Sequence, residues 1–171
     1  MRRYSIFLII PLIFALDRWT KWLVTENLRY GESVDIAPYF AVVHWRNLGG
    51  AFGFLSQHHL GKYVFMVLPL VVAVALGYAL IAYRWPTLKT FALTCVLAGA
   101  LGNIYDRVTV GYVIDFLLFY YKNLQWPAFN VADTSISTGI GLWLLAEFLV
   151  TLGKRKAVSG TSYKRQRREG G

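Results

Sequence analysis

The apolar residues of this chain gather into four long runs that are separated by more polar stretches. The runs cover residues 4–24, 63–83, 88–105 and 131–151, and only the second carries no charged residue. Each run approaches the roughly 20 apolar residues that a helix needs to cross a bilayer core of about 30 Å. The pattern therefore predicts an all-α integral membrane protein with four transmembrane helices.

A different pattern follows the first run. Residues 33–37 and 39–45 are rich in β-branched and aromatic side chains, which is typical of strands, and Asn-Leu-Gly-Gly at 47–50 then favours a turn. We expect a small extracytoplasmic β-structure over about residues 32–55, lying on the membrane surface. In the second long connection, the aromatic segment 116–121 is too short to span a bilayer, and we expect it at the interface.

Lysine and arginine set the expected orientation. They occur at Arg2 and Arg3 before the first run, at Arg84 and Lys89 around the start of the third run, and repeatedly within the stretch 154–168. If the chain has four spans, all these positions fall on one side of the membrane. Because Lys-rich and Arg-rich connections stay in the cytoplasm, both termini are expected there, with both long connections outside a bacterial inner membrane. Because the basic residues lie beside apolar runs, the net charge of +9 favours an interaction with anionic lipid headgroups over one with nucleic acid. We expect a membrane domain over 1–151 and a disordered basic tail over 152–171.

Three carboxylates in or beside apolar sequence are candidates for chemistry. Asp106 ends the third run, Asp115 has apolar neighbours on both sides, and Asp133 lies in the first turn of the fourth run. Placing an acid in apolar surroundings costs free energy, so each of these residues is a candidate for a functional site. If Asp115 and Asp133 meet, they can share one proton and serve as base and acid. The alternatives are that Asp133 only helps to cap its helix behind Asn130, and that Asp115 lies in an exposed turn.

The remaining polar groups of the runs favour structural roles. Asp17 and Lys21 are spaced i, i+4, so an ion pair would make both tolerable in the bilayer. Asp106 needs a backbone turn or a cation from another helix, and Glu147 is expected to pair or to reach the cytoplasmic interface. Small residues on the third and fourth runs allow close helix packing: Ala98, Gly99, Gly102, Ser135, Ser137, Gly139 and Gly141.

Other familiar chemistries lack their motifs in this sequence. No Gly-x-Ser-x-Gly motif, P-loop or dinucleotide fingerprint is present, and His44, His58 and His59 come without an HExxH pattern. The single cysteine, Cys95, can form neither an intrachain disulfide nor a cysteine metal cluster. We therefore expect no metal site, and we expect the histidines on the surface.

Five short motifs occur in an order that resembles the lipoprotein signal peptidase family, the bacterial aspartyl proteases also called signal peptidase II. The motifs are DxxxK at 17–21, NLGGAF at 47–52, GALGNIYDR at 99–107, VIDF at 113–116 and FNVAD at 129–133. The resemblance covers about residues 4–150. Family members often have Gly-Gly at positions 98–99 and Ala-Ala at 50–51, where this chain has Ala-Gly and Gly-Ala.

The resemblance implies a fold of four transmembrane helices with a periplasmic β-cradle. It implies cleavage of prolipoproteins just N-terminal to a lipobox cysteine that carries diacylglyceryl, without metal or organic cofactor. Asp115 and Asp133 match the catalytic pair, and Asp17 and Lys21 match a polar pair. Residues that match positions lining or bracing the site are Asn47, Gly49, Asn103, Asp106, Arg107, Asn130 and Ala132. The expected partners are prolipoproteins and membrane lipids, with no nucleic acid, and the protein is expected to be a monomer.

Two other function classes compete with this interpretation. Intramembrane acids also suit a small transporter or proton channel, although here the acids cluster toward one face of the membrane. A noncatalytic scaffold would use the same acids only for capping and pairing. Turnover of a diacylglyceryl-modified prolipoprotein separates these classes from a peptidase.

Overall fold

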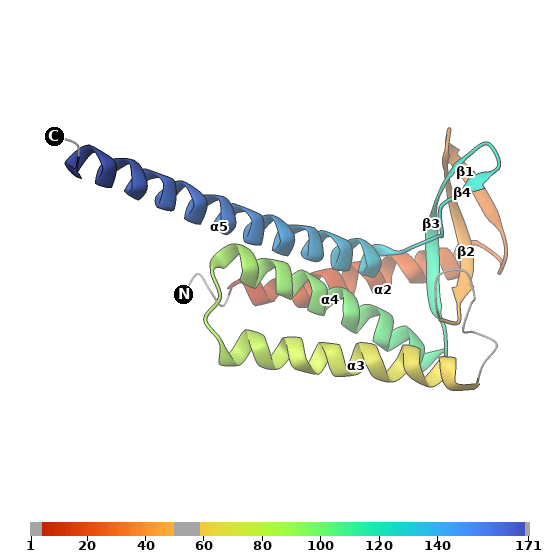
Figure 1. Cartoon of the computed structure of the whole chain (residues 1–171). Coiled ribbons are helices and arrows are strands. Elements are labelled where there is room, and N and C mark those ends of the chain that lie inside the picture. Colours follow the sequence, from red (N-terminus) through yellow and green to blue (C-terminus); the bar gives the residue numbers. More distant parts are fainter. Residues whose placement is uncertain (1–4, 50–58, 170–171) are drawn as a thin grey trace.

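A helix bundle with a small sheet across one end makes up this protein (Figure 1). The computed structural model describes residues 5–49 and 59–169, with side chains for 5–49 and 64–153. The motif residues Gly50, Ala51 and Phe52, as well as His58, lie outside the described residues. The helices are η1 (Ile6–Leu8), α2 (Ile9–Asn27), α3 (His59–Ala82), α4 (Thr87–Thr109) and α5 (Val131–Glu169).

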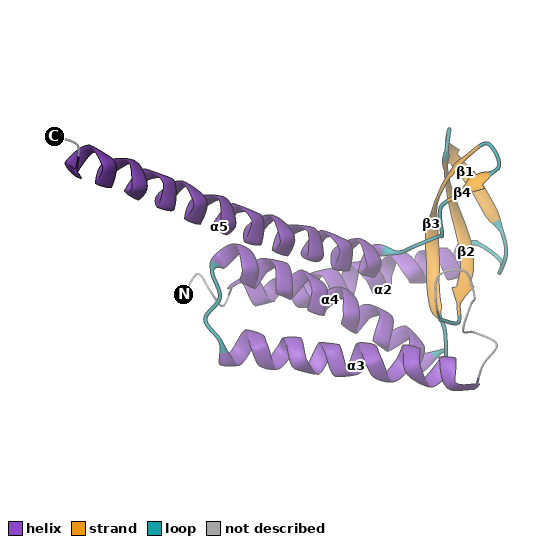
Figure 2. Cartoon of the chain, in the orientation of Figure 1, coloured by secondary structure: helices purple, strands orange, loops and turns teal. Residues whose placement is uncertain are grey.

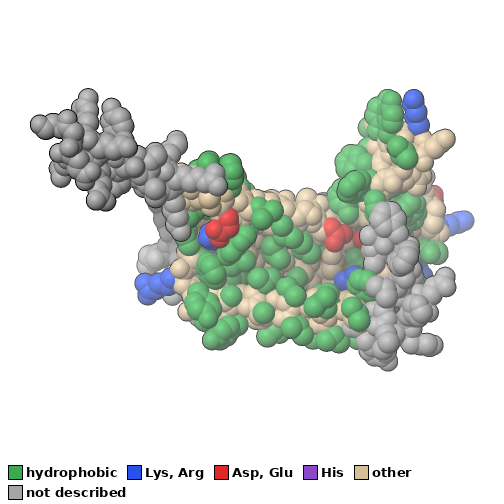
Figure 3. Space-filling view, viewed as in Figure 1, with side chains coloured by type: hydrophobic (Ala, Val, Ile, Leu, Met, Phe, Trp, Pro, Cys, Tyr) green, Lys and Arg blue, Asp and Glu red, His purple; other side chains and the backbone are tan. Residues whose placement is uncertain are grey.

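Three helices in the described part of the chain are long and apolar enough to cross a membrane. They cover Val64–Ala82, Thr87–Thr109 and Val131–Gly153, in agreement with the second, third and fourth predicted runs. On the face of the bundle shown in Figure 3, hydrophobic side chains cover much of the surface, as a lipid-facing surface requires. The first predicted run is also helical, but Asp17, Arg18 and Lys21 lie in the middle of α2. Because of these charges, the crossing of the membrane by α2 stays a prediction.

Helix α4 is the centre of the bundle and packs against α2, α3 and α5. Its contact with α5 is close enough to exclude side chains at two glycines. A Cβ at Gly99 would lie 2.3 Å from the carbonyl oxygen of Ala132, and one at Gly139 would lie 2.5 Å from that of Ala92. The prediction of close helix packing through small residues is therefore confirmed for these positions.

Two of the small residues predicted at this contact do not take part in it. Ser137 is exposed, and a Cβ at Gly141 would meet nothing within 4 Å. Ser135, by contrast, is buried and donates from its Oγ to the carbonyl oxygen of Cys95 at 2.8 Å. Because each helical residue turns the chain by about 100°, positions 137 and 141 lie nearly opposite the packed stripe of 135 and 139.

The sheet has four antiparallel strands in the order β1-β2-β3-β4 (Figure 2). Their bounds are β1 Ser33–Ala37, β2 Phe40–Asn47, β3 Val113–Tyr121 and β4 Leu124–Gln125. The strands predicted in the first long connection are thus confirmed. Residues 116–121, which the pattern predicts only as an interfacial segment, belong to β3: residues 117–119 pair with β2, and residues 120–121 pair with β4.

Helix α5 continues beyond the last predicted run. Its backbone stays helical to Glu169. Residues 152–169 of the expected disordered tail are therefore an extension of this helix. The stretch 152–169 contains no proline and many lysine and arginine residues, which have favourable helix propensity. The domain boundary at 152 remains a prediction.

Candidate active site

Asp115 is buried where β3 meets β2 and α5. It is the third residue of β3, lies opposite Trp45 of β2, and is 4% exposed. Its Oδ1 accepts a hydrogen bond from Asn130 Nδ2 at 2.8 Å, and its Oδ2 accepts one from Asn47 Nδ2 at 3.0 Å. The pairing of β2 with β3 brings Asn47 to this acid. The exposed-turn alternative for Asp115 is therefore wrong.

Asp133 stands in the first turn of α5, where a reciprocal capping box begins the helix. Asn130 Oδ1 accepts from the backbone N–H of Asp133 at 2.9 Å, and Asp133 Oδ2 accepts from the backbone N–H of Asn130 at 3.2 Å. The predicted N-cap is thus confirmed. The second carboxylate oxygen, Oδ1, accepts from Asn103 Nδ2 of α4 at 2.7 Å, so Asp133 does more than cap its own helix.

Asn130 is the residue that joins the two acids. Its side-chain amide binds Asp115, while its backbone N–H binds Asp133. The side chain is fully buried, and its Nδ2 also lies 3.2 Å from the carbonyl oxygen of Ile114 and from Asn103 Oδ1. One fixed amide therefore brings together the two carboxylates that the sequence predicts as a pair.

Burial raises the pKa of Asp115 from 3.8 to about 7, with a further contribution from the charge of Asp133. The hydrogen bonds from Asn47 and Asn130 and the charge of Lys21 act in the opposite direction and only partly offset this rise. Asp115 can thus hold a proton at nearly neutral pH, which is the property that an acid catalyst needs.

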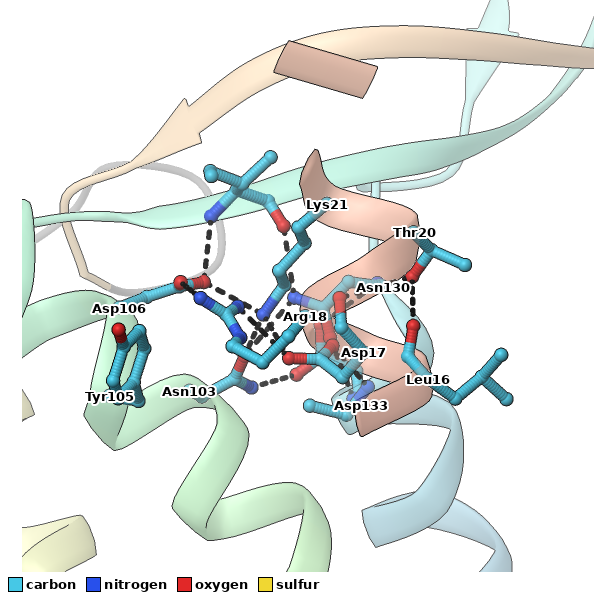
Figure 4. Close-up of polar contacts among 12 residues, drawn as sticks. Leu16, Asp17, Arg18, Thr20, Lys21, Asn103, Tyr105, Asp106, Asn130 and Asp133 are labelled. Carbon is cyan, nitrogen blue, oxygen red and sulfur yellow. Dashed lines mark hydrogen bonds and ion pairs between the residues drawn. The ribbon is translucent and has the colours of Figure 1, made fainter. Parts of the chain in front are cut away.

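A cluster of four charged side chains, Asp17, Arg18, Lys21 and Asp106, lies beside Asn103, Asn130 and Asp133 (Figure 4). Lys21 Nζ is 2.9 Å from Asp17 Oδ2 and 2.7 Å from Asp106 Oδ2, and it donates to Asn103 Oδ1 at 3.1 Å. These three acceptors match the three donors of an ammonium group. Arg18 lies 3.1 Å from Asp17 and 2.5 Å from Asp106. Two cations and two carboxylates therefore balance each other.

The predicted Asp17–Lys21 pair is confirmed, and so is the prediction that a cation from another helix compensates Asp106. The prediction omitted Arg18. Its only signal in the sequence is a count of charges, because Lys21 alone cannot neutralise both Asp17 and Asp106.

The charged cluster also holds the two elements that carry the acids. Asp106 Oδ2 accepts from the backbone N–H of Ile114 in β3 at 3.3 Å, and Asp17 Oδ1 accepts from the backbone N–H of Ala132 in α5 at 3.0 Å. Gly102 leaves room for this cluster, since a Cβ there would lie 2.7 Å from Asp17 Oδ2. The structure thus places Asp106, Ala132 and the polar pair in bracing positions around Asp115 and Asp133.

Gly49 and Arg107 complete the residues predicted for the site. The N–H of Gly49 donates to Asn47 Oδ1 at 2.9 Å, which leaves Asn47 Nδ2 free to bind Asp115. Gly49 has φ +129°, a backbone conformation that favours glycine. Arg107 is half-buried near the end of α4 and interacts electrostatically with three carboxylates, those of Asp106, Asp115 and Asp133.

His44 does not lie on the surface as predicted. It is 5% exposed, and its Nδ1 lies 2.9 Å from the carbonyl oxygen of Leu28, because β2 contacts α2, which ends just before Leu28. Glu147 forms the predicted pair, at 2.5 Å from Lys89 Nζ. Among residues 5–49 and 64–153, no three His, Cys, Asp or Glu side chains are grouped so that they could hold a metal ion.

Comparison with known proteins gives a consistent picture. A family described as "Signal peptidase (SPase) II" matches residues 9–149. A lipoprotein signal peptidase of Actinobacillus succinogenes is 40% identical over 146 residues, covering 84% of this chain and 88% of that protein. One of Thermodesulfovibrio yellowstonii is 40% identical over 144 residues, covering 84% and 95%.

A solved structure agrees with these relatives. It is described as a bacterial membrane enzyme solved by the in meso method at 2.3 Å resolution. It has a TM-score of 0.78 and 30% identity to this chain, and the match covers 88% of this chain and 91% of that one. These comparisons give no support to a transporter or channel.

Proposed function

This chain belongs to the signal peptidase II family, and we propose that it cleaves prolipoprotein signal peptides with Asp115 and Asp133 as an aspartyl dyad. The observation that carries the dyad is the position of Asn130, which binds one carboxylate through its side chain and the other through its backbone. A shared donor of this kind holds two acids at a fixed spacing, as a two-carboxylate mechanism requires.

The two acids have different environments and therefore different roles. Asp133 lies at the N-terminus of α5, where the helix dipole and the hydrogen bonds from Asn103 and the Asn130 N–H stabilise its carboxylate against the effect of burial, so we assign it the proton from the attacking water. Asp115 holds a proton below about pH 7 and presents it to the scissile carbonyl oxygen. Water oxygen adds to the carbonyl carbon and gives a tetrahedral intermediate. When this intermediate collapses, the C–N bond breaks, the proton held by Asp133 passes to the leaving amine, and the proton on the former carbonyl oxygen returns to Asp115. No step needs a cofactor.

The substrate and the membrane geometry follow from the same arrangement. We expect a prolipoprotein with a diacylglyceryl group on its lipobox cysteine, cut just N-terminal to that cysteine, and a monomeric enzyme among membrane lipids. The sheet stands at the opposite end of the bundle from the start of α2 and the end of α5 (Figure 1). With cytoplasmic termini, the acids therefore lie near the outer leaflet, beneath β1–β4 as the cradle.

Helix α2 fits as a fourth span because its charges are neutralised inside the protein. Asp17 is 0% exposed and Lys21 is 1% exposed. Arg18 of α2 and Asp106 of α4 complete a cluster without net charge. Intramembrane charges that pair with one another within a bundle are the tolerated kind.

The dyad is tested by turnover of a diacylglyceryl-modified prolipoprotein by the purified full-length protein. Asp115→Asn and Asp133→Asn should each lower kcat by roughly 10²- to 10⁴-fold, the usual contribution of a general acid or base. Asp35→Asn is the matched control, because Asp35 is an exposed acid of the same sheet whose side chain accepts from the Tyr120 hydroxyl at 2.9 Å. Wild-type turnover by either dyad variant would refute the assignment.

A further inference from the structure

Arg46 lies between two tyrosine rings on the exposed side of β2. Its guanidinium carbon is 4.5 Å from the ring centroid of Tyr30 and 4.7 Å from that of Tyr112. The Arg46 side chain is exposed, and both distances are well within the range of a cation–π interaction. A planar guanidinium can stack on both rings at once, which an ammonium group cannot do.

The three stacked residues come from three different parts of the chain. Tyr30 lies in the connection between α2 and β1, Arg46 lies in β2, and Tyr112 immediately precedes β3. The stack therefore ties together two connections and the end of one strand. Tyr30 also makes an edge contact with His44, with ring centroids 6.1 Å apart.

The end of β2 depends on this tie because it has a strand partner on one side only. The register of β1 with β2 ends at the pair Ser33 and Val43. Beyond His44, the described ladder pairs β2 only with β3, through Trp45, Arg46 and Asn47. Asn47 is the last residue of the strand, where pairing is weakest, and it is the residue that donates to Asp115.

We propose that Arg46, held between Tyr30 and Tyr112, is a positioning residue for the reaction. It fixes the end of β2 so that the Asn47 amide stays on Asp115. Successive side chains of a strand point to opposite faces, so Arg46 lies on the face away from the acids and acts through the backbone. This inference rests on the dyad proposed above.

The effect of the stack has a signature in the pH dependence of the rate. The Asn47 hydrogen bond acts to lower the pKa of Asp115. When that bond loosens, Asp115 keeps its proton to higher pH, and the alkaline limb of the kcat profile moves upward. The other groups that act on Asp115 are Asn130, the charges of Asp133 and Lys21, and Arg107, and all of these remain in place in an Arg46 variant.

The experiment is a double-mutant cycle between Arg46→Met and Asn47→Ala, with kcat measured against pH on the diacylglyceryl-modified prolipoprotein. Arg46→Met should lower kcat by roughly 5- to 30-fold, the rate equivalent of two exposed cation–π contacts, and should shift the alkaline limb to higher pH. Asn47→Ala should do the same more strongly. Adding Arg46→Met to Asn47→Ala should change neither quantity further, because the group being positioned is already absent.

Two variants serve as controls. Arg29→Met removes another exposed positive charge, from the connection that holds Tyr30, and should leave the profile unchanged. Tyr112→Phe keeps the ring and should also match the wild type. The positioning role is overturned if the effects of Arg46→Met and Asn47→Ala on kcat multiply in the double variant, or if the alkaline limb does not move in Arg46→Met. In either case, an inactive Asp115→Asn variant still supports the dyad. If Asp115→Asn turns over at the wild-type rate, the dyad itself fails.

Discussion

Replacing Lys21 by methionine removes one charge from a buried cluster that is otherwise balanced. Methionine preserves most of the apolar stem, so the change is confined to the ammonium group and its contacts with Asp17, Asp106 and Asn103. The two carboxylates are 0% and 1% exposed, and Arg18 becomes their only cation in the described cluster.

The expected cost follows from the burial of these carboxylates. Removing one partner of a buried ion pair costs about 3–5 kcal/mol, since a charge is left without compensation away from water. Arg18 already touches both carboxylates, although its side chain is 23% exposed. We therefore expect the lower end, about 3 kcal/mol. For a chain of this size, that corresponds to a fall in Tm of roughly 6–12 °C.

The assay is thermal unfolding of the purified protein in detergent, followed by tryptophan fluorescence. The matched variant is Lys21→Met combined with Asp17→Asn, which restores the charge balance without restoring the ammonium group. It should recover much of the lost Tm. A fall of less than about 2 °C in Lys21→Met, or a further fall in the double variant, would refute the electrostatic reasoning.

Two further predictions concern stability. The folded-state pKa of Asp115 is raised from 3.8 to about 7, so its contribution to stability is fully present below pH 3.8 and is lost as pH rises through 7. Relative to the wild type, Asp115→Asn should therefore gain up to about 4 kcal/mol between pH 4 and pH 8 in thermal unfolding; a constant difference would contradict the shift. Gly99→Ala should cost about 1–3 kcal/mol because the new Cβ would meet the backbone of α5, whereas Gly141→Ala should be neutral or stabilising in the same measurement.

The helices were the most predictable part of the fold, because long apolar runs have few other solutions. The strands of the first connection were predictable from their β-branched residues. Strand β3 was not, because Val113, Ile114, Asp115 and Phe116 are all buried. A strand that is covered on both faces loses the alternation of apolar and polar residues by which strands are recognised.

The candidate site was predictable as a set of costly acids but not as a network. The expense of burying Asp17, Asp106 and Asp115 can be read from their apolar neighbours. Their partners cannot, because Lys21 and Asn103 are 82 residues apart in the chain. Which cation meets which acid depends on how the helices pack. The stack of Arg46 had no local signal for the same reason.

The charged cluster has a consequence for the order in which this protein enters the membrane. The middle of helix α2 carries Arg18 and Lys21 against Asp17 alone, whereas Asp106 and Asn103 are synthesised later, with α4. If α2 crosses the membrane as proposed, an isolated α2 would bring this uncompensated positive charge into lipid. On that proposal, α2 reaches its full charge balance only when α4 packs against it, so its integration is coupled to the assembly of the bundle.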